Sequence, residues 1–206
     1  MDNKKLEHCI QLIRRLPPGK TDQNINAISN LIYEEDELLN AFLQKVDTPS
    51  SINTDQSFLM CEYNRDGDSY RSPHNNQYYP PIEDGKYPSK QLRDLEVKMN
   101  KMFYLYATQY YSNSAISSVY LYEIGNRIQD GFIVAILIKN TIESEKELNS
   151  GTWDSVNFVH VTFNQEDSLT VTYKITTTII LKMKLYHKHF SDLSLSGTLT
   201  RQVIEY

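Results

Sequence analysis

Apolar residues recur at three- and four-residue spacing through the first 46 positions, in three short segments separated by turn-forming residues. The first segment ends at residues 17–19, Pro-Pro-Gly, because proline lacks the amide donor that a helix needs and glycine frees the backbone. Short helices with short connections favour antiparallel neighbours, so we predict an antiparallel three-helix bundle over residues 1–48. Its apolar positions are Leu6, Cys9, Ile10, Ile13 and Leu16, then Ile25, Ile28, Leu31 and Ile32, then Leu38, Leu39, Phe42, Leu43 and Val46.

Residues 49–88 lose this periodicity and hold five of the seven prolines. The region is rich in tyrosine and poor in Ser/Gly repeats, which indicates an ordered, irregular region and not a flexible linker. Only residues 58–63 (FLMCEY) resemble a strand, and we predict one short strand there. Helical spacing then returns and predicts one longer helix over residues 89–112. Its apolar positions are Leu92, Leu95, Met99, Met102, Phe103, Tyr106 and Tyr110.

From residue 113 onward the pattern changes to β-branched and aromatic runs separated by turn residues. The connections are too short for crossover helices, so neighbouring strands are expected to be antiparallel. The sequence therefore predicts an α+β fold: one elongated unit in which helices and an irregular region precede an antiparallel sheet over residues 113–206. The runs cover residues 119–122, 132–138, 153–163, 169–185 and 193–203.

The 206-residue chain carries a net charge of −5, and this charge is unevenly distributed. Residues 174–206 contain five Lys/Arg against two Asp/Glu, a balance of +3, which leaves −8 for the first 173 residues. The overall charge repels nucleic acid, and we predict no nucleic-acid partner. The basic segment leaves two interpretations open: one locally attractive face, or a few solvated lysines that protect a strand edge.

The chain shows no feature of a membrane or secreted protein. Its longest apolar run, residues 131–138, is far shorter than the ~20 residues of a membrane helix, and the N-terminus lacks the apolar core of a signal peptide. The two cysteines, Cys9 and Cys61, suit reduced and partly buried thiols better than a disulfide. We therefore expect a cytoplasmic protein without a membrane span.

Candidate catalytic and metal sites are weak. Residues 64–68 (NRDGD) are similar to a calcium loop, but Pro73 stands where the loop needs its bidentate glutamate, so a hydrogen-bonded acidic turn is the better interpretation. No nucleophile elbow, phosphate-binding glycine loop or paired carboxylates appear in the sequence, so we expect neither an enzyme nor a cofactor.

An interaction surface is the remaining hypothesis. Alternation in residues 170–178 (TVTYKITTT) is typical of a sheet with one covered face, yet one helix can shield only part of five strands. Either another chain or a further helix should therefore cover the rest. An unpaired edge strand also invites strand addition, so we expect the isolated chain to self-associate or to be poorly soluble.

Five strings in this chain carry a family resemblance, in the same order and across residues 1 to about 202. They are residues 14–18 (RRLPP), 61–73 (CEYNRDGDSYRSP), 117–121 (SSVYL), 153–155 (WDS) and 199–202 (LTRQ). The chain resembles the β subunit of the heterodimeric F-actin capping protein. The resemblance implies a helical stalk, a sheet shared with a related α subunit, and calcium-independent, noncatalytic binding to the actin filament barbed end that blocks subunit exchange. A cytoskeletal location follows from it.

The resemblance also implies functional residues. Arg201 matches a basic residue on the family's actin-facing surface, whereas Lys182, Lys184 and Lys188 are candidates from local charge alone; Arg201 as a strand-end residue paired with an acid is the alternative. Three further residues match the groove that binds capping-protein-interaction peptides of regulators, and their structural alternatives are a helix-end cation, a helix-stop acid and a packed loop tyrosine. These three residues are Arg15, Asp47 and Tyr78.

In the family, the β subunit continues past the Leu-Thr-Arg-Gln string into a long helix across the sheet and an actin-binding tentacle, whereas this sequence ends at Tyr206. Two hypotheses follow. The chain is either the β subunit of a barbed-end capper, or a dimerisation or regulatory scaffold that no longer caps. An enzyme or a calcium sensor is a third hypothesis, which has only the acidic turn in its favour.

Overall fold

A computed structural model of the chain describes residues 3–15, 21–43, 50–111, 114–125, 130–143, 150–164, 170–187 and 190–205. The chain divides into two compact units, Met1–Asp47 and Thr48–Tyr206. Each unit has its own buried apolar residues, and each is described separately below.

The N-terminal unit contains helices α1 (Asn3–Arg15), α2 (Thr21–Leu31) and α3 (Asp36–Leu43). Helix α1 contacts both α2 and α3. An exposed ion pair links α1 to the turn before α3, with Lys5 Nζ 2.9 Å from Glu35 Oε1. The buried apolar residues come from the three apolar stripes of the sequence and are Ile10, Ile28, Ile32 and Leu38.

The larger unit is built on a five-stranded antiparallel sheet with the order β10-β9-β8-β7-β6. The mixed α+β composition and the antiparallel sheet predicted from the sequence are confirmed. Each strand pairs with the next one along the chain, as short connections require. The strands are β6 (Ala115–Glu123), β7 (Phe132–Glu143), β8 (Ser150–Phe163), β9 (Val171–His187) and β10 (Phe190–Glu205).

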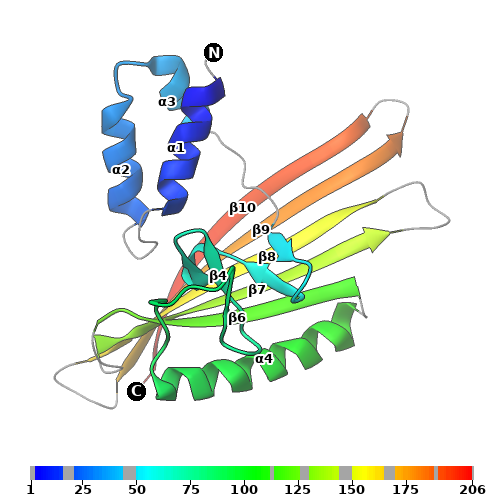
Figure 1. The fold of residues 1–206 in the computed structure, drawn as a ribbon. Helices are drawn as coiled ribbons and strands as arrows, with labels where there is room; N and C mark the ends of the chain where they lie inside the picture. The colour runs from blue at the N-terminus through cyan, green and yellow to red at the C-terminus, as the bar shows by residue number, and fades with distance from the viewer. Residues whose placement is uncertain are drawn as a thin grey trace. The chain divides into compact units, whose positions relative to one another are not determined.

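Helix α4 (Lys90–Tyr111) runs along β6, at one side of the sheet (Figure 1). Part of its apolar stripe packs on one face of the sheet, where Leu92 is fully buried among strand residues, whereas Met102 and Tyr110 of the predicted stripe are 67% and 63% exposed. Burial of this kind contributes roughly 25 cal/mol per Å² of apolar area removed from water. The cluster comprises Leu92, Val119, Leu121, Val134 and Ile136, with Met99, Phe103, Phe132 and Val159 packed against it.

The opposite face of β6 and β7 packs against residues from the segment that precedes α4. That segment forms a hairpin, β1 (Ser51–Asn53) with β2 (Phe58–Met60), and a second small sheet, β3 (Arg65–Asp66), β4 (Ser69–Arg71) and β5 (Tyr78–Tyr79). The expectation of one short strand in residues 49–88 is therefore wrong. Strands of two or three residues are too short to show alternation in the sequence, and they form here because a packed surface holds them. The buried cluster on this face comprises Leu59, Tyr120, Ala135 and Leu137.

Candidate interaction surface

The two faces of the sheet can be followed across all five strands, because cross-strand partners in an antiparallel ladder lie on the same face. Val159 packs in the α4 cluster, and its partner on β9 is Ile175, whose partner on β10 is Arg201. Phe158 packs in the opposite cluster, and it is followed across the ladder by Thr176. We call these the α4 face and the opposite face. Odd-numbered residues of β8, β9 and β10 thus lie on the α4 face.

The half of the sheet formed by β6 and β7 is covered on both faces. On the α4 face Val119 and Leu121 are at most 1% exposed, and on the opposite face Tyr120 and Ala135 are fully buried. The Tyr120 hydroxyl also donates to the Leu59 carbonyl oxygen at 2.6 Å. On this half, groups from the same chain both bury the apolar side chains and accept the hydrogen bond of the buried Tyr120 hydroxyl.

The half formed by β9 and β10 has a mainly apolar α4 face that is half-buried on β9 and exposed in the middle of β10. Leu195 and Leu199 on β10 are 54% and 69% exposed, although both are large apolar residues on the same face of a strand. A contiguous apolar surface of this kind usually marks a site of association. The apolar residues on this face are Tyr173, Ile175, Ile179, Leu181 and Met183 on β9, and Leu193, Leu195, Leu199 and Val203 on β10.

The opposite face of β9 and β10 is rich in hydroxyl groups. The Thr176 and Thr200 hydroxyls lie 3.1 Å apart, and those of Thr178 and Thr198 lie 2.9 Å apart, so the two strands are joined by side-chain hydrogen bonds as well as by the backbone ladder. This face suits contact with water. Strands β9 and β10 are therefore amphipathic, with an apolar side that lacks cover from the described residues.

The two edges of the sheet differ as well. At the β6 edge, Asn100 of α4 accepts the Val119 N–H through Oδ1 at 2.9 Å and donates through Nδ2 to the Val119 carbonyl at 2.8 Å. Glu96 Oε2 accepts the Leu121 N–H at 2.8 Å. Side chains of α4 thus occupy the backbone groups of the β6 edge and block another strand from pairing there.

The β10 edge has no such protection among the residues that the structure describes, where β9 is its only strand neighbour. Residues 193–200 (LSLSGTLT) contain no charge and no proline, the features that usually prevent edge pairing. Every second residue of β10 directs its backbone N–H and C=O away from β9. This edge is therefore a template for an additional strand.

Glu96 holds the covered half together through a buried ionic network. Its two carboxylate oxygens accept bonds from Arg71 Nη1 and Nη2 at 2.7 and 2.8 Å, and Arg93 forms a further ion pair with it. Arg71 and Glu96 are 2% and 0% exposed. Burial lowers the pKa of Arg71, but hydrogen bonds from the guanidinium to Glu96 and the charge of Glu96 raise it by more. The network ties β4, α4 and β6 to one another.

Sequence reasoning missed Glu96 and Asn100, although the sequence contains a signal for the first. Glu96 lies four residues after Leu92 and three before Met99, within the apolar stripe of the helix. An acid in a buried stripe indicates a partner of opposite charge or a set of hydrogen-bond donors. Nothing in the local pattern indicates that this partner is Arg71 or the edge of β6.

The structure does not bring the predicted basic residues together. Arg201 is exposed on the α4 face, to which the odd-numbered residues of β9 and β10 belong. Lys182 and Lys184 are even-numbered residues of β9 and are exposed on the opposite face. Lys182 is paired with Ser194, seven residues before Arg201, which corresponds to roughly 23 Å along the strand. Lys188 lies outside the described residues. The +3 balance of residues 174–206 is thus spread over both faces.

Of the three residues predicted to line a regulator groove, only Tyr78 falls on described side chains. It is 5% exposed, its hydroxyl donates to the Lys86 carbonyl at 2.5 Å, and its ring meets that of Tyr87 edge-on at 5.4 Å. Burial raises the pKa of the Tyr78 hydroxyl to about 12. Tyr78 is thus a packed tyrosine of strand β5. The Arg15 side chain and Asp47 lie outside the described residues.

The acidic turn at residues 66–68 uses its carboxylates internally. Asp66 Oδ2 accepts the Lys86 N–H at 3.0 Å, and Asp68 Oδ1 lies 3.5 Å from Arg65 Nη2. Gly67 adopts a left-handed conformation with φ of +58°, which glycine takes without strain. Within the described ranges, no group of three or more His, Cys, Asp or Glu residues is arranged to hold a metal ion.

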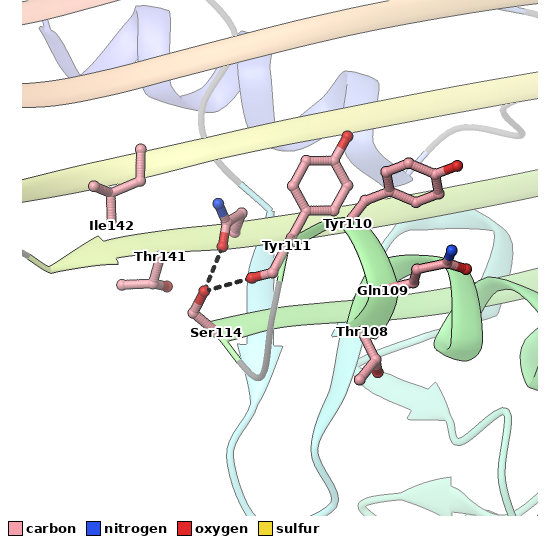
Figure 2. Close-up of a pocket in the computed structure, with 8 residues that line it drawn as sticks. Thr108, Gln109, Tyr110, Tyr111, Ser114, Thr141 and Ile142 are labelled. Atoms are coloured by element: carbon pink, nitrogen blue, oxygen red, sulfur yellow. Dashed lines mark hydrogen bonds between the residues drawn. The ribbon is translucent and has the colours of Figure 1, made fainter.

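An open pocket of about 960 Å³ lies where α4 ends and β6 begins (Figure 2). Its lining is uncharged and combines aromatic rings with hydroxyl and amide groups. The Ser114 hydroxyl lies 3.0 Å from the Tyr111 carbonyl oxygen and 2.8 Å from Asn140 Oδ1, and the Tyr111 ring packs on Trp153 at 5.2 Å. The lining holds no carboxylate, imidazole or thiol, the groups that usually carry acid–base and nucleophilic catalysis.

A family model described as F-actin capping protein, beta subunit, matches residues 6–205. The chain is 36% identical over 208 residues to F-actin-capping protein subunit beta of Dictyostelium discoideum, with 98% of this chain and 73% of that protein covered. It is 38% identical over 206 residues to the protein of the same name from Drosophila melanogaster, with 98% and 71% covered. The counterpart from Arabidopsis thaliana is 37% identical over 207 residues, with 96% and 77% covered.

A solved structure of a homodimeric actin capping protein alpha subunit from Plasmodium berghei is also similar, with a TM-score of 0.47 and 16% sequence identity. The similarity covers 98% of this chain and 79% of that chain. Among the helices of the described residues, none is both long and apolar enough to span a membrane.

Proposed function

Because the chain belongs to the F-actin capping protein beta subunit family, we propose that it pairs with an alpha subunit and that the pair binds the barbed ends of actin filaments. The observation that carries this proposal is the unprotected strand β10, which ends the sheet beside a bare apolar face. A sheet with one blocked edge and one open edge is built to be continued by another chain. The protein acts in this view as a noncatalytic component of the actin cytoskeleton.

The alpha subunit fits this surface in two ways. One of its strands pairs with β10 and satisfies the outward backbone groups, as in other cases of β-augmentation. Apolar residues of the partner cover the α4 face around Leu195 and Leu199, which are exposed, and leave the end of β10 at Arg201 open to actin. Obligate interfaces resemble a protein core divided between two chains, which is the chemistry of this face.

Capping then works by occupancy of the barbed end. The bound heterodimer blocks subunit addition and loss, and no bond is made or broken. We propose that Arg201 contacts acidic groups of actin from the α4 face, and that Lys182, Lys184 and Lys188 add attraction from the other side of β9 and beyond. Exposed charges of this kind mainly raise the rate of encounter.

We further propose that capping is independent of calcium. One oxygen of each carboxylate is already engaged, Asp66 Oδ2 by the Lys86 amide and Asp68 Oδ1 by the Arg65 guanidinium. Binding of a cation at the turn would have to displace these contacts.

We also propose that Arg15, Asp47 and Tyr78 contribute to the binding of regulator peptides. Tyr78 is buried and its hydroxyl is engaged by the Lys86 carbonyl, which supports an indirect role in which a peptide does not contact that hydroxyl. Tyr78→Phe should then leave the affinity for a capping-protein-interaction peptide unchanged, as measured by fluorescence anisotropy with the purified heterodimer.

The main experiment follows actin elongation from filament seeds with this chain, with its alpha subunit, and with both together. The pair should stop barbed-end growth at substoichiometric amounts relative to actin, with the same result in EGTA and in calcium. Stable heterodimers that leave elongation unchanged would instead show a dimerisation or regulatory scaffold, and slowing that requires calcium would show a calcium sensor.

Charge reversals refine the actin contact. Arg201→Glu should raise the concentration needed for half-maximal slowing by about tenfold, and Lys182→Glu with Lys184→Glu by about threefold or less, each effect shrinking as salt is added. Asp192→Lys, an exposed position on β10 with the opposite change of charge, is the matched control. Equal effects of all variants would remove Arg201 from the contact.

A further inference from the structure

The central residues of β10, 194–200, have a sequence that is nearly the same in both directions around Gly197. Moving outward from that glycine, Ser196 matches Thr198, Leu195 matches Leu199, and Ser194 matches Thr200. Gly197 is also close to the middle of the strand, which spans Phe190–Glu205. A strand with this symmetry is complementary to a second copy of itself in antiparallel pairing, where residue i meets residue 394 − i.

We propose that two copies of this chain associate through β10, about a two-fold axis at Gly197, and form one continuous antiparallel sheet. A two-fold axis perpendicular to the sheet keeps each face on the same side in both copies. Leu195 then lies opposite Leu199 of the second copy on the α4 face, and Ser196 lies opposite Thr198 of the second copy on the hydroxyl-rich face. The bare apolar surfaces of the two chains become neighbours.

Other registers fit less well. A shift of the centre to Thr198 separates Leu195 from Leu199, placing Leu195 opposite Arg201 and Asp192 opposite Ile204 of the second copy, whereas the register centred on Gly197 keeps Leu195 opposite Leu199 and places Arg201 opposite Leu193. A shift of the centre to Ser196 leaves the last residues of β10 without partners. Registers in which odd-numbered residues of one copy meet even-numbered residues of the other would place apolar residues on the hydroxyl-rich face, and they are excluded for that reason. The register centred on Gly197 is the one that combines nearly full overlap with like-to-like pairs.

Nothing in the described part of β10 opposes this pairing. Residues 193–200 contain neither charge nor proline, and the N–H and C=O groups on the outer side of β10 gain partners when a second copy of β10 docks. The contrast with β6 is direct, because Asn100 and Glu96 block that edge. Self-association does not depend on actin binding, but it uses the edge that the proposed function assigns to the alpha subunit. The two partners therefore compete.

A cysteine at the axis tests the register. A Cβ atom added to Gly197 has no neighbour within 4 Å, so Gly197→Cys is sterically tolerated. Directly opposed residues in antiparallel strands have Cα atoms about 4.5–5.5 Å apart, within the range for a disulfide. Mild oxidation of the full chain should therefore convert most of this variant to a covalent dimer. The unsubstituted chain, which contains Cys9 and Cys61, gives the background.

Leu199→Cys is the matched control on the same strand and face. In the proposed register the thiols introduced at position 199 of the two copies are offset by about four residues, or about 13 Å along the strand, and cannot form a disulfide. Cross-linking through position 199 in preference to position 197 would overturn the register. Background-level cross-linking in both variants would overturn the dimer.

A charge pair tests the same contact without cysteine. Leu195→Glu and Leu199→Lys should each weaken the dimer by about tenfold in sedimentation equilibrium, whereas the double variant should return to within about threefold of the original affinity because each Glu faces a Lys of the other copy. Thermal unfolding of all three variants checks that the monomer remains folded. Failure of the double variant to recover, with folding intact, would overturn the pairing of residues 195 and 199.

Competition separates this inference from the proposed function. Addition of the alpha subunit should dissolve the homodimer and yield heterodimers. A monodisperse monomer in the absence of the alpha subunit, together with a heterodimer that caps filaments, would overturn the self-association alone. A homodimer with the predicted cross-link, together with a heterodimer that does not slow elongation, would overturn capping and support the self-association.

Discussion

The two halves of the sheet differ in their strands and in what surrounds them. Strands β6 and β7 lie between α4 and the short strands of the preceding segment, and their core residues are almost fully buried. Strands β9 and β10 alternate apolar with hydroxyl-bearing residues, unlike the continuous apolar run at the start of β7, and they leave Leu195, Leu199 and Ile204 between 49% and 69% exposed. The apolar residues of the second half thus lack the cover that the first half has.

The comparison extends to the edges of the sheet. Strand β6 has its outward backbone groups occupied by Asn100 and Glu96, whereas β10 has the sequence of an unprotected strand. One half of the sheet is covered by described residues of its own chain, and the other half leaves apolar residues exposed among the described residues. Stability of the chain should therefore depend mainly on the covered half, and association on the bare half.

The largest effect is expected from Glu96→Ala in the covered half. It leaves Arg71 buried and without its carboxylate partner, and it removes the acceptor of the Leu121 N–H, so the free energy of unfolding should fall by about 3–5 kcal/mol. Urea denaturation followed by circular dichroism gives the value. Asp94→Asn removes the same charge from an exposed position of α4 and should change stability by less than about 0.5 kcal/mol. Similar losses in the two variants would show that the network contributes nothing specific.

The next largest effect is expected from a leucine-to-alanine substitution, which can be made once in each half of the sheet. Leu121→Ala removes a side chain that is 1% exposed and should cost about 2–5 kcal/mol, whereas Leu199→Ala, at a position 69% exposed, should cost less than about 0.5 kcal/mol. Unfolding at protein concentrations below the range of association isolates the monomer. For dimer formation, measured at higher protein concentration, Leu199→Ala should have the larger effect of the two variants. Leu199→Ala weakens dimers, whereas Leu121→Ala leaves the β10 edge intact. Equal stability costs would remove the distinction between the halves.

A smaller effect is expected when the Asn100 side chain, which occupies backbone groups of the β6 edge, is removed. Asn100→Ala leaves the Val119 N–H and carbonyl without their side-chain partner and should lower the free energy of unfolding by about 1–3 kcal/mol. It should also increase light scattering on storage, because a second edge becomes available for strand addition. Asn100→Asp still accepts the Val119 N–H but cannot donate to the Val119 carbonyl. Its free energy of unfolding should lie between those of the original chain and Asn100→Ala. If Asn100→Ala changed neither the free energy of unfolding nor light scattering, the Asn100 side chain would not be needed to protect the β6 edge.

The smallest effect concerns His160, which lies on β8 at the boundary between the halves. Burial, and then the charge of Lys174 across the ladder, lowers its pKa below 6.5 in the folded state. The unfolded chain therefore binds more protons just below pH 6.5, so stability should decrease as pH falls through that value toward the lower folded pKa. His160→Gln should flatten the dependence of the unfolding free energy on pH between about 7.5 and 5.5, relative to His74→Gln at an exposed loop position. An NMR titration that gives His160 an ordinary or raised pKa would contradict the sign.

Much of the fold was predictable because it depends on local patterns. Helical spacing over residues 89–112 anticipated α4, and five β-rich runs with short connections anticipated the antiparallel order of β6 to β10. The candidate site was predictable only in part. An open sheet edge followed from the shortage of cover, but the sequence did not show that Lys182 and Lys184 lie on the opposite face from Arg201, which the register of β9 and β10 decides.

By itself, the sequence determined the order and type of the main elements, the absence of recognisable catalytic motifs, and the strings that identified the family. Periodicity and turn chemistry act within a few residues, so they can be read along the chain. Only the tertiary structure decided that α4 guards β6, that Glu96 meets Arg71, and that Leu199 remains exposed while Leu121 is buried. Burial and pairing depend on which distant segments become neighbours, so leucines on two strands of one sheet can differ completely in these respects.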